Sequence, residues 1–389
     1  MTTRQPSSIA VTFRNIGERV LIDPTLGVIS LMLMFTLIAA FAMPIFFAGN
    51  NIYNLISSSI TVMILSIGMT VVLISGGIDL SVGAVMALCA GVAATVIKTG
   101  APLFVAIIIA ILVGMTAGLL NGVLVTRVGL PDFIATLAML GFASGVLYIA
   151  TQGVPIIGYM TSDYYIIGGL DRLFGPVTFP ILMAISLAAV VGFVLSRTRL
   201  GTHFFAVGSN SVAARQSGIP VRWVKTQAYV LSGVCAAIAG IILAGRNSNV
   251  PADLGVGYEI QAISAAIIGG ASLMGGRGRV LGAVLGALTL ALAVNIINLA
   301  GVPSSFQKIV IGVILLLAVI ANYLSDYARV ATLRWKARRL SSGSAWAQQQ
   351  TKKPGSLFRR WIKKEEKALI TLTTQNTEME KDNEKLTKN

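Results

Sequence analysis

Residues 54–75 read NLISSSITVMILSIGMTVVLIS, a mostly apolar run without a charged side chain. A membrane-spanning helix needs about 20 predominantly apolar residues, and this run meets that length by itself. The same rule predicts about ten spans, near residues 27–48, 54–75, 80–98, 102–125, 133–151, 177–196, 226–245, 260–274, 280–299 and 306–324. The run 260–274 is short and rich in glycine, so we expect its helix to be broken or re-entrant. Because the runs lack the two-residue alternation of a membrane barrel, the predicted fold class is an all-α polytopic membrane protein.

The composition of the whole chain argues against the common soluble classes. Of the 389 residues, 55% are hydrophobic and only 12% are charged, whereas a soluble domain carries about 25% charged residues. A soluble enzyme would lack the charges that its surface needs. Intrinsic disorder is excluded because the apolar content is too high.

The distribution of basic residues predicts which side of the membrane each loop faces. The formal net charge is +15, which in a soluble protein would suggest nucleic-acid binding. With a cytoplasmic N-terminus, the inner segments hold 11 basic residues, and the outer segments hold only Lys98, Arg172, Arg246 and Lys308. Residues 325–389 add 15 basic and 7 acidic residues after the last span. The positive-inside rule therefore places both termini in the cytoplasm, and we expect no nucleic-acid partner.

The chain is expected to divide into three parts. Residues 1–26 form a cytoplasmic N-terminal segment, 27–326 form the ten-helix domain, and 327–389 form a basic and then polar cytoplasmic tail that is partly disordered. Tryptophans interleaved with the basic residues of this tail suit an anionic lipid surface. Spans two to five and seven to ten are comparable blocks of opposite orientation, which predicts the inverted repeats frequent in transporters.

Motifs for chemistry are missing from the spans. The run Gly270–Arg277 lacks the Gly-Lys-Ser/Thr ending of a phosphate-binding loop, and no Cys/His cluster has metal-ligand spacing. Asp79, Asp132 and Glu259 fall at the predicted span edges, whereas a proton-coupled carrier usually needs ionisable groups inside the membrane. We therefore expect a chain that is not an enzyme and that holds no cofactor of its own.

A first constellation, SGGIDLSVG at residues 75–83, lies at a predicted cytoplasmic turn between two spans. Gly76 and Gly77 permit a tight turn. Asp79 is placed to cap the following helix, where exposed amides favour a carboxylate, and Ser81 is placed to satisfy the same helix start. The prediction is a structural turn and helix cap.

A second constellation lies in the loop 197–225, the longest predicted on the cytoplasmic side. Asn210 or Ser211 is placed to cap a short helix over 212–217, and Gly218 and Pro220 are suited to end it. A second short helix is expected near 221–226. Such short helices need a partner surface, and the residues alone leave open whether a protein or the lipid headgroups provide it.

Four segments carry a resemblance to a known family. They are SGGIDLSVG (75–83), PDFIATL (131–137), AARQSGI (213–219) and IIGGASLMGGRG (267–278). Over roughly residues 30–325, the chain resembles the permease subunits of bacterial ABC importers for ribose and other monosaccharides, within the sugar and branched-chain amino acid permease superfamily. The resemblance implies a type II ABC importer-like fold in the bacterial inner membrane.

The resemblance also implies partners and sites. It implies a second permease copy (the same chain or a close paralogue), a periplasmic sugar-binding protein, and an ATPase subunit that binds ATP-Mg. Val212 stands where the wider coupling motif has glutamate, and the ATPase-coupling residues implied are Ala213, Ala214, Arg215, Gln216, Ser217, Gly218 and Ile219. Lys98, Arg172 and Arg246 are candidates for docking the binding protein, or else are solvated loop charges. The alternative function is a self-contained secondary carrier or channel for a small polar solute.

Overall fold

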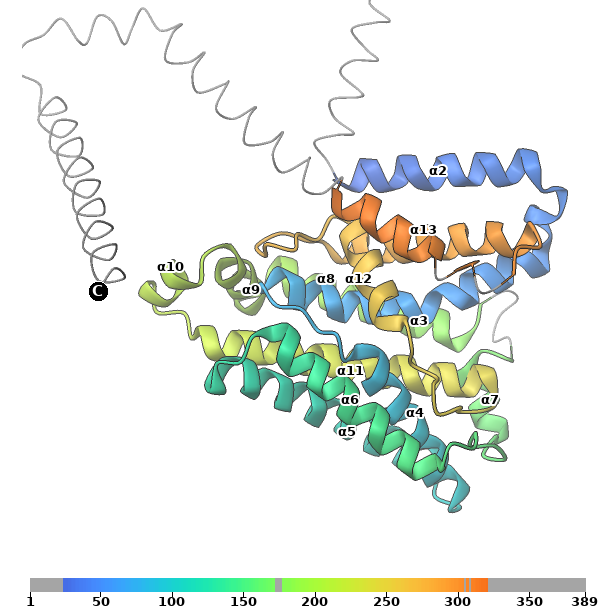
Figure 1. Cartoon of the computed structure of the whole chain (residues 1–389), viewed down its shortest axis with the longest axis horizontal. Helices are drawn as coiled ribbons and strands as arrows, with labels where there is room; N and C mark the ends of the chain where they lie inside the picture. Colours follow the sequence, from blue (N-terminus) through green and yellow to red (C-terminus); the bar gives the residue numbers. More distant parts are fainter. Residues whose placement is uncertain (1–23, 172–176, 304–305, 308, 321–389) are drawn as a thin grey trace, which may run out of the picture. The chain divides into compact units, whose positions relative to one another are not determined.

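The computed structural model describes residues 24–171, 177–303, 306–307 and 309–320 of the chain (Figure 1). The chain divides into two units, Met1–Asp326 and Tyr327–Asn389. The predicted tail, most of the predicted N-terminal segment and Arg172 lie outside the described residues.

The described residues are mainly helical, with an isolated antiparallel bridge between Ile156 and Val250. The elements in chain order are α2 (Pro24–Ala42), η1 (Pro44–Phe47), α3 (Gly49–Ile74), α4 (Val82–Lys98), α5 (Leu103–Val123), η2 (Leu124–Val128), α6 (Asp132–Thr151), α7 (Ser162–Gly168), α8 (Phe179–Arg197), α9 (Arg199–Ser209), α10 (Ser211–Gln216), α11 (Val221–Asn247), α12 (Tyr258–Ile268) and α13 (Val280–Leu299). A further apolar helix spans Ile309–Ile320.

The predicted all-α membrane fold is confirmed, and the number of complete spans differs from the prediction. Each of the ten predicted spans coincides with an apolar helix, but seven described helices have the length and composition to cross a membrane. The other three, α4, α12 and Ile309–Ile320, have only 10–17 residues. α12 ends at Ile268, as its glycine-rich C-terminal flank predicts, so the expectation of a broken span holds there.

Two helices, α3 and α11, form the centre of the bundle. Their apolar windows are 83% and 78% buried, against 11% for α2 and 22% for α8. α11 packs on α4 and α5, and α3 packs on α12 and α13. α4 packs on α5 just as α12 packs on α13. The two predicted blocks thus make matching contacts around the α3–α11 pair, as an inverted repeat requires.

α4 and α12 both begin in the interior, where their first turns meet. Gly83, in the first turn of α4, packs on the backbone of Gly255, just before α12, so closely that a Cβ on either glycine would overlap the other's carbonyl oxygen. Farther along α4, Met86 contacts Gly240 of α11. Only glycine allows two backbones to approach in this way.

The glycine rows of the spans have different environments. Gly114, Gly118 and Gly122 of α5 lie against the backbone of α11, and a Cβ on any of them would overlap it. Gly141 and Gly145 of α6 have the same spacing, yet nothing in the described structure lies within 4 Å of a Cβ built there. The same spacing therefore accompanies a close helix crossing in α5 but, within the described residues, none in α6.

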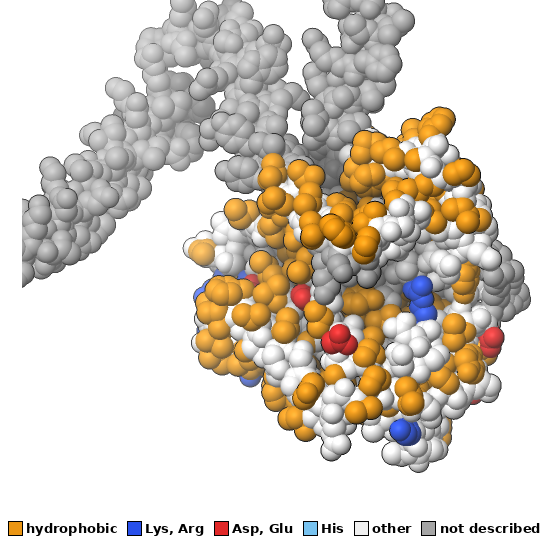
Figure 2. All heavy atoms as spheres, turned by 45° about the vertical axis from the view of Figure 1, so that its right-hand side comes forward, with side chains coloured by type: hydrophobic (Ala, Val, Ile, Leu, Met, Phe, Trp, Pro, Cys, Tyr) orange, Lys and Arg blue, Asp and Glu red, His pale blue; other side chains and the backbone are white. Residues whose placement is uncertain are grey.

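The outward surface of the helices is apolar. Figure 2 shows hydrophobic side chains over much of one face, with few charged groups among them. Large exposed hydrophobic residues occur along α2, α5, α6 and α8. Such a surface suits lipid tails rather than water.

Candidate functional site

The first part of the candidate site is the corner formed by α9 and α10, at one end of the bundle (Figure 1). We call this the α10 end. The predicted helix over 212–217 is present as α10, Ser211–Gln216. The separate helix expected near 221–226 is wrong, because this segment is the start of the long α11. α9 lies within the predicted loop 197–225, so its helical state differs from the prediction.

Side-chain and backbone caps shape the corner. The predicted cap is present: the Asn210 side chain accepts hydrogen bonds from the amides of Val212 (3.0 Å) and Ala213 (2.9 Å). Gly218 adopts φ +81°, and its amide and that of the next residue bond back to the last turn of α10. This glycine-terminated arrangement ends the helix, as the sequence predicts.

Most of the predicted coupling residues lie on the surface of the corner. Ala213, Arg215, Gln216, Ser217 and Gly218 are exposed, and Ile219 is half-buried. Ala214 is an exception, because it is buried in an apolar cluster that includes Phe204 and Val224. Ala214 therefore anchors α10 to α9 and α11, while its neighbours present a small, exposed surface.

A cluster of close backbone contacts joins this corner to the core. Gly208 of α9 packs against the end of α3 at Ile74 and against Gly276, in the loop between α12 and α13. The Gly276 amide donates to the Ile74 carbonyl at 2.9 Å. Lys225 of α11 donates its Nζ to the Gly76 carbonyl at 3.1 Å. Gly208 has no side chain and meets backbone atoms of Ile74 and Gly276. A displacement of α9 would therefore be passed directly to the end of α3.

The second part of the site is the turn 75–81, and its place differs from the prediction. Gly76 has φ +73° and lies at the α10 end, but the chain then turns into the bundle rather than remaining at its surface. Asp79 is buried and accepts a 2.8 Å hydrogen bond from Ser232, the twelfth of the 27 residues of α11. The expectation that Asp79 lies at a span edge is therefore wrong, because α4 begins in the interior.

Asp79 and Ser81 connect three elements. One Asp79 oxygen accepts from the Ser81 amide (3.0 Å) and hydroxyl (2.6 Å), and the other accepts from Ser232. Asn121 of α5 donates to the Ser81 hydroxyl at 2.8 Å. The carboxylate thus accepts a hydrogen bond from the amide of Ser81, the residue preceding α4, and it also links α4 to α11 through Ser232. Gly77 packs against the Tyr229 hydroxyl, where a Cβ would be crowded.

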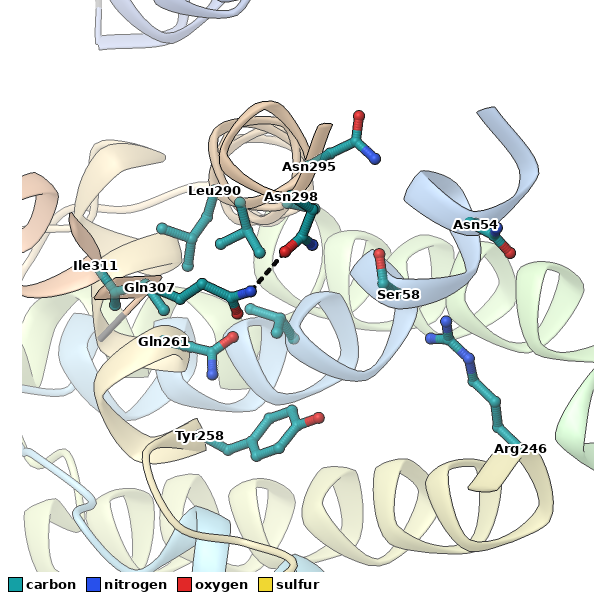
Figure 3. A pocket seen from close by; sticks show the side chains of 13 residues that line it. Asn54, Ser58, Arg246, Tyr258, Gln261, Leu290, Asn295, Asn298, Gln307 and Ile311 are labelled. Atoms are coloured by element: carbon teal, nitrogen blue, oxygen red, sulfur yellow. Dashed lines mark hydrogen bonds between the residues drawn. The ribbon is translucent and has the colours of Figure 1, made fainter. Parts of the chain in front are cut away.

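The third part is a pocket of about 350 Å³ at the end of the bundle opposite α10. It lies among α3, α11, α12, α13 and the last described helix (Figure 3). The polar residues that line it are Asn54, Ser58, Arg246, Tyr258, Gln261, Asn295, Asn298 and Gln307. Its volume lies at the lower end of the range of ligand pockets, about 300–1,000 Å³.

The basic residues predicted on the outer side have different environments in the structure. Lys98 is exposed at the end of α4. Arg246 is half-buried and lines the pocket, so the expectation of a surface docking charge does not describe its position. The pocket amides were not predicted as site residues, although an amide such as Gln261 within an apolar run is itself a signal of a polar interior position.

The described residues contain no cluster of three or more His, Cys, Asp or Glu side chains that would suit a metal ion. Cys89 and Cys235 are buried, free thiols within α4 and α11. Neither supplies a ligand set or a disulfide.

Comparison with known proteins identifies the family. Residues 51–319 match the family model described as branched-chain amino acid transport system / permease component. The chain is 38% identical over 298 residues to the ribose import permease protein RbsC of Escherichia coli (strain K12), covering 76% of this chain and 92% of that protein. It is 36% identical over 301 residues to the Bacillus subtilis (strain 168) protein of the same name, covering 77% and 92%.

A third relative is named for a different substrate. The autoinducer 2 import system permease protein LsrC of Salmonella paratyphi B (strain ATCC BAA-1250 / SPB7) is 35% identical over 264 residues, covering 67% of this chain and 74% of the relative. The resemblance inferred from the four sequence segments is thereby confirmed. The chain belongs to the family of branched-chain amino acid transport system permease components and is a permease component of an ABC importer.

Proposed function

We propose that this permease subunit moves a monosaccharide, ribose or a close analogue, inward across the bacterial inner membrane, driven by a separate ATPase subunit. The observation that carries the proposal is the corner 213–219, which presents mostly exposed residues at one end of the bundle. The ribose import permeases among its relatives support the substrate.

In this mechanism the ATPase docks on the α10 end, which faces the cytoplasm. ATP-Mg binding closes the ATPase and displaces α9 and α10. Gly208 passes the displacement to Ile74 at the end of α3 and to Gly276, and α3 carries it into the centre of the bundle. A second permease copy completes the pathway, and a periplasmic binding protein delivers the sugar to the opposite end, where Lys98 is exposed.

The test is reconstitution of the chain in proteoliposomes with its ATPase and binding protein. Ala213→Arg places a long, charged side chain on the exposed face of α10, and we expect sugar-stimulated ATP hydrolysis to fall at least tenfold because docking is obstructed. Ala213→Ser, which keeps the side chain small, is the matched control and should retain coupling. Equal coupling in both variants would disprove the docking site, and sugar uptake without the ATPase would favour a self-contained carrier.

A further inference from the structure

The pocket opposite the α10 end has a chemistry that restricts its ligand. We infer that it is a solute-binding site within each permease subunit that accepts a neutral polyhydroxylated molecule and rejects a zwitterionic amino acid. The inference rests on the proposed function, since it concerns the substrate of the same pathway. It adds a location, binding residues and a selection against the substrate named in the family description.

The position of the pocket suits a site on the route of the solute. Arg246 and Asn298 are each the second-last residue of their helix, α11 and α13. Tyr258 is the first residue of α12, which begins in the interior of the bundle. The pocket therefore connects one end of the bundle with the start of a discontinuous helix, and transporters commonly bind their substrates at such helices.

The amide side chains of the pocket match hydroxyl groups. Figure 3 shows Gln261, Gln307 and Asn298 around one space, with the Gln307 Nε2 donating to Asn298 Oδ1 at 2.6 Å. Each amide offers both donors and an acceptor, and a sugar hydroxyl needs both. In the described part of the chain no hydrogen bond engages the Gln261 side chain, so this amide retains its full capacity for a ligand. The Tyr258 ring adds a flat apolar face beside these amides.

The charge of the lining disfavours an amino acid. Arg246 is the one charged side chain among the described residues that line the pocket. Its guanidinium can donate to sugar oxygens or to a carboxylate, but the described lining has no acidic group to receive an α-ammonium. That ammonium would meet only the neutral oxygens of the pocket amides and hydroxyls, which compensate a buried charge less fully than a carboxylate does. Val62, Val294 and Ile311 supply some apolar wall, yet apolar contact does not replace an anionic partner.

The first experiment measures binding directly. The purified full-length chain in lipid nanodiscs is mixed with millimolar D-ribose, L-arabinose, D-xylose, D-galactose or L-leucine, and saturation-transfer difference NMR reports contact. We expect a signal from at least one sugar and none from leucine. In Gln261→Leu, which keeps the size but removes the amide, the sugar signal should fall about five- to tenfold. Asn247→Ala, an exposed asparagine adjacent to Arg246 and outside the lining, should keep it.

The second experiment separates this inference from the proposed function. In the reconstituted importer, Gln261→Leu should lower the maximal sugar uptake rate about five- to tenfold with an unchanged KM, because the binding protein sets the KM, and basal ATP hydrolysis should persist. If the wild-type importer takes up sugar and the Gln261→Leu importer does so at the same rate, the inference about the pocket is wrong and the proposed function stands. A leucine signal as strong as the sugar signal, or no sugar signal at all in the wild-type chain, would also overturn the pocket.

Discussion

Asp79 illustrates how a single residue can lie far from where its sequence neighbours indicate. Hydropathy identifies the apolar runs on either side of residues 75–81 but not the depth at which the second run begins. Because α4 starts inside the bundle, the carboxylate meets Ser232 near the middle of α11 instead of water. Three hydrogen bonds to the carboxylate offset the free-energy cost of burying it at this depth.

The first prediction concerns this carboxylate. Asp79→Ala leaves the hydroxyl of Ser232 and the amide of Ser81 without their acceptor, so we expect a loss of about 1–3 kcal/mol in stability. The measurement is the apparent thermal unfolding midpoint of the detergent-solubilised chain. Asp163→Ala, which removes an exposed aspartate from α7, is the matched control. Equal midpoints for the two variants would show that the Asp79 network does not hold α4 to α11.

At the scale of the helices, the same glycine spacing has two different outcomes. A Cβ at Gly118 of α5 would overlap the Tyr229 carbonyl, whereas a Cβ at Gly141 of α6 meets open space in the described structure. We expect Gly118→Ala to destabilise the chain by about 1–3 kcal/mol, as overpacking typically does. Gly141→Ala should be neutral or stabilising by up to about 1 kcal/mol, because alanine favours the helix.

An SDS titration followed by circular dichroism can compare these two variants with the wild-type chain. The pair is matched in residue type, substitution and helical setting, so any difference reports the environment of the glycine. If both variants lost stability equally, the close α5–α11 crossing would not be the cause.

The helices also show which elements a sequence can predict. The cap at Asn210 and the stop at Gly218 are local, so α10 is predicted to within a residue. The glycines after Ile268 likewise predict the early end of α12. α9 follows α8 after one non-helical residue, Thr198, and the side chain of that residue caps it by accepting from the Gly201 amide. Its helical state depends on packing Phe204 and Val207 into the core, which a charged loop sequence does not reveal.

For the whole molecule, the orientation in the membrane follows from charge counting and can be measured. We expect the α10 end in the cytoplasm, because the segments assigned inside carry 11 basic residues against four outside. Cys89 and Cys235 are 0% exposed, so a membrane-impermeable maleimide should not label the unmodified chain. Ala213→Cys should be labelled only in inside-out vesicles, and Thr99→Cys only from the outside of spheroplasts. The reverse pattern would invert the topology.

The candidate site was predictable in part. The corner 211–218 is contiguous in sequence, and its capping residues identify it. The pocket is assembled from five helices or segments, and its amides, such as Asn54, Gln261 and Asn298, are far apart along the chain. Each amide alone indicates a polar position in a span. Only the arrangement of α12 between α3 and α13 brings these side chains to one space.

The meeting of Gly83 and Gly255 has a genetic consequence. In most contacts a residue that grows too large can be offset by a smaller partner, so a damaged protein can recover through a second mutation across the contact. Here both partners are already the smallest residue, and each approaches the backbone of the other. Neither residue can be replaced by a smaller one to make room for a larger partner. Revertants of a substitution at either glycine are therefore expected to restore the glycine itself or to shift whole helices, and the two sites can change only by abandoning this crossing.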